Sequence, residues 1–99
     1  MRLISTDIAL LQAVVSQVAP DANAIRLFGS RIDDQAKGGD IDLMIDFNHL
    51  IERPALLSTL FSVSISRALQ GWAFDVILRA PNVLEGPIHK VAEREGILL

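Results

Sequence analysis

The stretch that most constrains this chain is FGSRIDDQAKGGDIDLMID at residues 28–46. A short apolar run ends at Gly29-Ser30, and nine residues separate Ser30 from Asp40-Ile-Asp42, which opens a second apolar run. In a strand, residues i and i+2 point to the same face, about 6.5–7 Å apart at Cα. We therefore expect the carboxylates of Asp40 and Asp42 to project from the same face of a strand.

Two neighbouring carboxylates repel each other, and each is costly to remove from water without a partner. A fold tolerates such a pair when a hard cation lies between the two side chains, and carboxylate oxygens suit Mg²⁺. The sequence therefore predicts a magnesium site at the start of this strand, with Asp40 and Asp42 as ligands.

Length and composition limit the class of protein. Ninety-nine residues are enough for one domain, residues 1–99, with a two-layer core. No run approaches the roughly 18 uninterrupted apolar residues of a membrane span, and the absence of cysteine is compatible with a reducing cytoplasm, so we expect a cytoplasmic protein. Nine basic against twelve acidic residues offer no basic face, and we expect no direct binding of nucleic acid.

The hydrophobic pattern predicts an alternating series of elements in the order α-β-α-β-α-β-α, in which the second α is a short helical turn after Ser30. Pro20 and Gly71 mark helix ends, and Pro54 suits the first turn of a helix. The expected helices span residues 5–19, 31–35 (the short turn), 55–70 and 88–95, and the expected strands span residues 24–28, 41–47 and 73–79.

The order of the elements predicts where the acidic residues meet. The second and third strands are joined by a helical crossover, so they should run parallel and place Asp40, Asp42 and Asp75 at one edge of the sheet. The first strand must run antiparallel to bring Ser30 to the same edge. We therefore expect an α/β (α+β) fold with a mixed three-stranded sheet flanked by helices.

This arrangement suits phosphoryl chemistry. The Gly29-Ser30 turn exposes backbone N–H groups at a helix start, a site that attracts phosphate, and Arg31 is either a phosphate ligand or a surface charge. Three carboxylates can hold two Mg²⁺ ions, which stabilise the attacking and leaving oxygens of a displacement at phosphorus. The chain lacks both GxxxxGKS and a glycine-rich kinase loop. The expected reaction is attack on the α-phosphate of a nucleoside triphosphate, with pyrophosphate leaving.

The segments GSRIDDQAKGGDIDLMID, FDVIL and IHKVAEREGILL together resemble the minimal nucleotidyltransferases of the DNA polymerase β superfamily. The resemblance covers essentially the whole chain and implies the nucleotidyltransferase fold. It implies that Gly29 and Ser30 bind the triphosphate and that Asp40 and Asp42 bridge two metal ions. It further implies that Asp75 holds the catalytic metal near the attacking hydroxyl.

The resemblance also implies a partner. In minimal members the helical protein that completes the system is typically separate, of the HEPN or substrate-binding type. Many such pairs resemble toxin–antitoxin modules, in which the transferase transfers AMP from ATP to a tyrosine of an RNA-cleaving HEPN protein and silences it. Two alternatives stay open: an antitoxin that acts by binding alone, and a nucleotide sensor without turnover.

The helix expected at residues 55–70 is apolar over more than half its circumference. Leu56, Leu60 and Val63 make one stripe, and Leu57, Phe61, Ile65 and Ala68 make a second. One stripe is enough to pack on a sheet, so the other is surplus. That surplus fits burial beneath another helix and an interface with a second chain equally well, so a homo-oligomer stays open; the stripe would also suit the helical partner.

Four other residues receive a structural interpretation. Asp46 shares a strand face with Asp42 but lies roughly 13 Å away, and we expect it to be solvated or to cap a helix. His49 and His89 have no second histidine at ligand spacing and are expected at the surface. Trp72 is expected to pack at the sheet edge.

Overall fold

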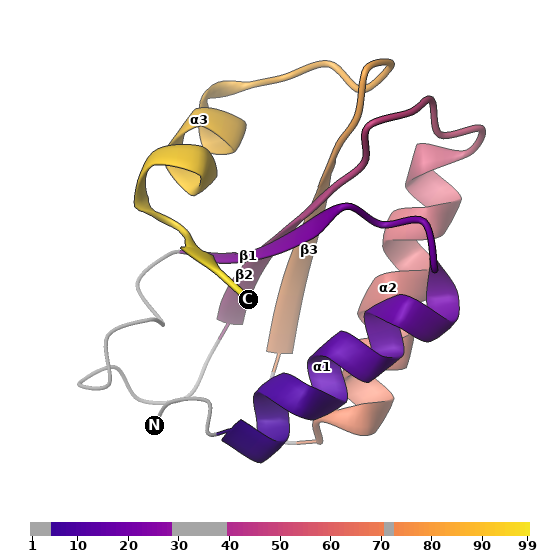
Figure 1. The fold of residues 1–99 in the computed structure, drawn as a ribbon, viewed down its shortest axis with the longest axis vertical. Helices are drawn as coiled ribbons and strands as arrows, with labels where there is room; N and C mark the ends of the chain where they lie inside the picture. The colour runs from indigo at the N-terminus through magenta and orange to yellow at the C-terminus, as the bar shows by residue number, and fades with distance from the viewer. Residues whose placement is uncertain (1–4, 29–39, 71–72) are drawn as a thin grey trace.

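The computed structural model describes residues 5–28, 40–70 and 73–99. Figure 1 shows their arrangement: a twisted sheet with two helices on one side and a third on the other. The short helical turn expected at residues 31–35 and Trp72 lie outside the described residues. The elements are α1 Ser5–Val18, β1 Ala24–Phe28, β2 Asp40–Asp46, α2 Pro54–Ala68, β3 Ala73–Arg79, α3 Pro87–Glu95 and β4 Ile97–Leu98.

The sheet is mixed, with strand order β3-β2-β1-β4. Strands β2 and β3 are parallel and β1 is antiparallel to β2, which confirms both directions expected from the chain order. The expected number of strands is wrong, because Ile97 and Leu98 form a fourth strand antiparallel to β1. A backbone hydrogen bond of 2.9 Å from Leu99 N to the carbonyl oxygen of Ile25 extends this short pairing.

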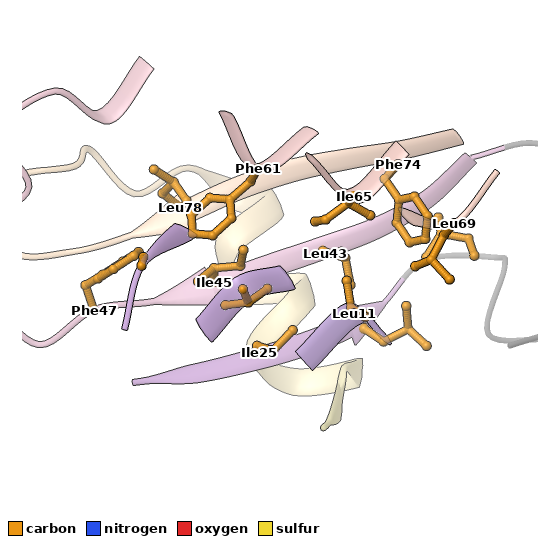
Figure 2. Packing of buried hydrophobic residues seen from close by; sticks show 14 of the residues in the cluster. Leu11, Ile25, Leu43, Ile45, Phe47, Phe61, Ile65, Leu69, Phe74 and Leu78 are labelled. Atoms are coloured by element: carbon orange, nitrogen blue, oxygen red, sulfur yellow. The ribbon is translucent and has the colours of Figure 1, made fainter. Parts of the chain in front are cut away.

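The core lies between the sheet and the α1–α2 layer. Strand alternation sends Ile41, Leu43 and Ile45 toward these helices, where each is buried with at most 1% of its surface exposed. Figure 2 shows Phe61 and Ile65 of α2 on the side of the sheet that carries Leu43 and Ile45, in one cluster with them. Burying large aliphatic and aromatic side chains stabilises the fold by about 1.5–3 kcal/mol each, so this face fixes the register of β2.

A second, smaller cluster lies on the opposite face of the sheet. Met44 of β2, Phe28 of β1 and Ala92 of α3 are buried together, with Ile77 of β3 packed against them. The α3 helix therefore covers part of this face, over β1 and β2.

The expectation that His89 is a surface group is wrong, since it is 8% exposed. Its Nδ1 accepts a hydrogen bond of 3.0 Å from the backbone N–H of Gly86, at the start of α3. Nδ1 is thus the acceptor nitrogen, so Nε2 carries the proton and donates to the carbonyl oxygen of Leu78 at 3.0 Å. His89 thus caps the start of α3 and connects this helix to β3 by a hydrogen bond. No local sequence pattern indicates either contact.

At the outer edge of the sheet, side chains donate hydrogen bonds to two backbone carbonyl oxygens of β3. Besides His89, the Ser58 hydroxyl donates to the carbonyl oxygen of Val76 at 3.0 Å. A sheet edge with unpaired carbonyls can pair with another chain, so these two contacts reduce that tendency.

The α2 helix places one of its two apolar stripes in the core, where Phe61 and Ile65 are fully buried. The surplus stripe of Leu56, Leu60 and Val63 is 44–50% exposed, although α1 packs beside α2. Burial beneath another helix of the same chain therefore does not account for this stripe. Across the described residues, the longest apolar helices fall short of what a bilayer crossing requires.

Candidate functional site

Two of the expected site residues lie directly opposite each other in the sheet. The parallel register of β2 and β3 pairs Asp42 with Asp75 and, two residues earlier, Asp40 with Ala73. Neighbouring strands are about 4.7–4.9 Å apart, so two paired aspartates bring their carboxylates within reach of one shared cation. The expectation that parallel pairing brings these acidic residues to one edge of the sheet is met for Asp42 and Asp75.

Both carboxylates belong to the face of the sheet that α3 partly covers. Asp42 lies two residues before Met44 of the smaller cluster, and Asp75 lies two residues before Ile77, which packs against that cluster. Both aspartates therefore lie on this face. Asp42 is half-buried and Asp75 is exposed. The site is thus open to solvent on the side of Asp75 and bordered by packed apolar residues on the side of Met44.

The described part of Asp40 is its backbone, which opens β2. Gly29, Ser30 and Arg31 lie outside the described residues. Phe28, however, is the last residue of β1 and the antiparallel register partner of Asp42. The chain therefore enters the Gly29-Ser30 segment from a position beside Asp42.

The donor set at this edge fits a hard cation. Hard divalent ions such as Mg²⁺ take carboxylate oxygens, and Asp42, Asp75 and Asp40 would supply only such ligands. Like-charged residues directly opposite in a sheet destabilise it, so a bound cation would also relieve the repulsion between Asp42 and Asp75. Within the described residues, which exclude the Asp40 side chain, no three Asp, Glu, His or Cys side chains form a metal-binding group.

Asp46, at the other end of β2, has a different environment from the one expected. It is 6% exposed rather than solvated, and its Oδ2 accepts hydrogen bonds from Arg79 at 3.0 Å and Arg26 at 3.3 Å. Arg79 also pairs with Glu93 of α3 at 2.9 Å. The expectation is wrong because the arginines come from β1 and β3, and only the sheet register brings them to Asp46.

This network stabilises the charged guanidinium of Arg79. Partial burial by itself lowers the pKa of the Arg79 guanidinium, but hydrogen bonds and charge interactions with Asp46 and Glu93 outweigh it, and the pKa rises above its ordinary value. The network therefore serves as a fixed structural ion pair across β1, β2, β3 and α3. His49, in contrast, lies at the surface as expected, where it pairs with Asp21.

Comparison with known proteins places the fold. Neither a protein-family model nor a curated protein matches the sequence. The structure matches the crystal structure of a "putative nucleotidyltransferase" from Sulfolobus solfataricus with a TM-score of 0.52 and 25% sequence identity, over 94% of this chain and 81% of that chain. This chain has the nucleotidyltransferase fold.

The nucleotidyltransferase fold gives a context for the acidic edge of the sheet. Proteins of this fold use nucleoside triphosphates with metal ions in general, which agrees with the chemistry expected from Asp42 and Asp75. The sequence reasoning missed the Asp46 network, the buried His89 and strand β4. A signal for the first was present, since Arg26 is the only polar residue of its strand and Arg79 ends a largely apolar one.

Proposed function

We propose that this protein is a magnesium-dependent nucleotidyltransferase that transfers a nucleoside monophosphate, AMP from ATP, to a hydroxyl group of a partner protein. By its resemblance to the minimal nucleotidyltransferases, the partner is a small helical HEPN protein and this chain is its antitoxin. The observation that carries the proposal is the register of Asp42 opposite Asp75 across two parallel strands, beside the end of β1.

A purely structural role explains this pair poorly. Like charges directly opposite each other in a sheet are destabilising. At the far end of the same two strands the chain uses an acid opposite an arginine instead. A cation shared by Asp42, Asp75 and Asp40 would turn the unfavourable pair into a binding site.

The proposed transfer is a displacement at the α-phosphorus of the triphosphate. In the reaction the acceptor oxygen forms a bond to the α-phosphorus, the bond from that phosphorus to the bridging oxygen breaks, and pyrophosphate leaves with the electron pair. When bound, Mg²⁺ supplies positive charge next to the phosphate oxygens. Asp75 is exposed, so an acceptor hydroxyl can approach it and lose its proton to this carboxylate or to water.

The triphosphate is assigned to the segment that follows β1. Gly29 and Ser30 would present backbone N–H groups and a hydroxyl to the phosphates, and Arg31 would add a positive charge. The position of Phe28 beside Asp42 supports this assignment, because a nucleotide held after β1 would have its phosphates next to the carboxylates.

The direct test is mass spectrometry of a candidate partner, the protein encoded alongside this one, after incubation with this chain, Mg²⁺ and each nucleoside triphosphate in turn. The expected result is a mass increase of one nucleoside monophosphate, with ATP as donor. An unmodified partner with every triphosphate, despite a formed complex, would contradict catalysis.

A matched pair of variants separates catalysis from binding. Asp42→Asn should abolish modification of the partner, whereas Asp21→Asn makes the same chemical change at an exposed surface ion pair and should leave it intact. If Asp42→Asn still silences the partner at equal concentration, this protein acts by binding alone.

A further inference from the structure

The α1–α2 layer carries almost no charge. Among the 14 residues of α1 and the 15 residues of α2, the charged side chains are Asp7 and Arg67 alone. The nine residues of α3, on the other face of the sheet, include Lys90, Glu93 and Arg94. These helices carry Ser, Thr and Gln residues on their outer side, but a helix that faces water normally carries charged residues as well. The scarcity of charge is what we expect of a covered surface.

The centre of this surface is the stripe of Leu56, Leu60 and Val63, which we call the α2 stripe. These side chains are 50%, 47% and 44% exposed. A shallow hollow of about 260 Å³ borders Leu56 and Leu60 and includes Glu52. A second hollow, of about 460 Å³, borders Val63 and includes Arg67.

We propose that the α2 stripe is a two-fold interface between two copies of this chain, with the two α2 helices antiparallel. Such an interface uses the same patch on both copies, and the patch must complement itself. The α2 stripe does so, because Glu52 lies just before the first turn of α2 and Arg67 lies in its last turn, at opposite ends of the stripe.

In the antiparallel arrangement each Glu52 faces Arg67 of the partner subunit, and each Leu56 faces Val63 of the partner subunit. Within the described residues neither Glu52 nor Arg67 forms an ion pair in its own chain, whereas other acidic and basic residues do. Arg53, beside Glu52, would lie opposite Ser66 of the partner subunit. An unrelated partner would require no such match between the two ends of one helix.

The arrangement leaves the candidate site accessible. Asp42 and Asp75 lie on the α3 face of the sheet, and the α2 stripe lies on the opposite, helix-covered side. Two copies joined through α2 would therefore each keep an open acidic edge. The interface does not depend on the proposed transferase activity, and either can fail without the other.

Sedimentation velocity of the full chain over a concentration series tests the interface. The wild type is expected to pass from monomer to dimer as concentration rises. Leu60→Arg puts a charge near the two-fold axis, and Val63→Arg does so one turn later; both should remain monomeric with an unchanged circular dichroism spectrum. Leu84→Arg, at a loop residue that is 93% exposed, is the matched control and should dimerise like the wild type.

Charge reversal tests the antiparallel geometry. Glu52→Arg and Arg67→Glu should each weaken dimerisation several-fold, because each opposes like charges across the interface, and the double variant should restore it. A wild type that stays monomeric at its highest soluble concentration overturns the proposal, even if the α2 stripe binds another protein. A dimer that survives both Leu60→Arg and Val63→Arg, or a double reversal that fails to restore it, overturns the proposal as well.

Discussion

Strands β2 and β3 pair acidic residues in two ways only four positions apart. At the far end of the strands, Asp46 is the register partner of Arg79, and its buried carboxylate is held by two arginines. At the near end, the same strands pair Asp42 with Asp75, an acid with an acid. The same two strands thus carry an acid held by two arginines at one end and two acids in register at the other. The contrast separates a structural ion pair from a candidate metal site.

The largest expected effect is on transfer activity. Asp42→Asn keeps the size of the side chain and removes the charge that would hold the metal. We expect nucleotidyl transfer to fall at least 100-fold, equivalent to about 2.7 kcal/mol of transition-state stabilisation. The rate of partner modification, measured by mass spectrometry, checks this. A rate within a few-fold of the wild type would remove Asp42 from the site.

Asp46→Ala should have the opposite profile, with lower stability and retained activity. The change removes the carboxylate that Arg26 and Arg79 share, but both arginines are about a quarter exposed and can be rehydrated. We therefore expect a loss of about 1–3 kcal/mol in the free energy of unfolding, on the order of 10 °C in melting temperature. Urea denaturation measures the first quantity, and equal stability would show that the network is not structural.

Mg²⁺ should stabilise the protein by binding at the Asp42–Asp75 end of β2 and β3, and the Asp46 end should contribute nothing to this effect. A ligand at a free concentration of ten times its dissociation constant raises the free energy of unfolding by about 1.4 kcal/mol. Thermal melting with Mg²⁺ and with a chelator should show this increase in the wild type and in Asp46→Ala, and should not show it in Asp75→Asn. An equal metal effect in all three proteins would place the ion elsewhere.

The smallest expected effect is on stability without metal. Asp75→Asn removes the like charge opposite Asp42, so the chelated variant should be more stable than the chelated wild type by roughly 0.2–1 kcal/mol. Urea denaturation in chelator provides the comparison. A less stable variant would mean that Asp75 makes a structural contact that the register alone does not indicate.

The sequence predicted local structure well where the hydrophobic pattern was regular. Strands at residues 24–28 and 73–79 agree with β1 and β3, and the parallel pairing followed from the helical crossover. The two-residue strand β4 could not be predicted, because Ile97 and Leu98 are too short a run to show alternation. For the site, position along the chain was enough to place Asp42 beside Asp75.

Local sequence patterns could not predict the polar contacts between residues far apart in the chain. His89 bonds to Leu78, eleven residues earlier, and Asp46 bonds to arginines 20 and 33 residues away. Asp46 was expected to be solvated or to cap a helix, and His89 to lie at the surface, because nothing near them in sequence indicates a partner. The exposure of the α2 stripe was also undecided, since an apolar helix face has the same pattern beneath a neighbouring helix as at an interface between chains.

The central claim, that Asp42 and Asp75 hold one ion together, is tested most directly by a double-mutant cycle on metal affinity. Mn²⁺ binding would be measured calorimetrically for the wild type, Asp42→Asn, Asp75→Asn and the double variant. Residues that share a ligand are non-additive, with coupling of about 0.5–3 kcal/mol. We predict that each single change weakens binding strongly and that the second adds little. Additive effects, or unchanged affinity in the double variant, would contradict the account.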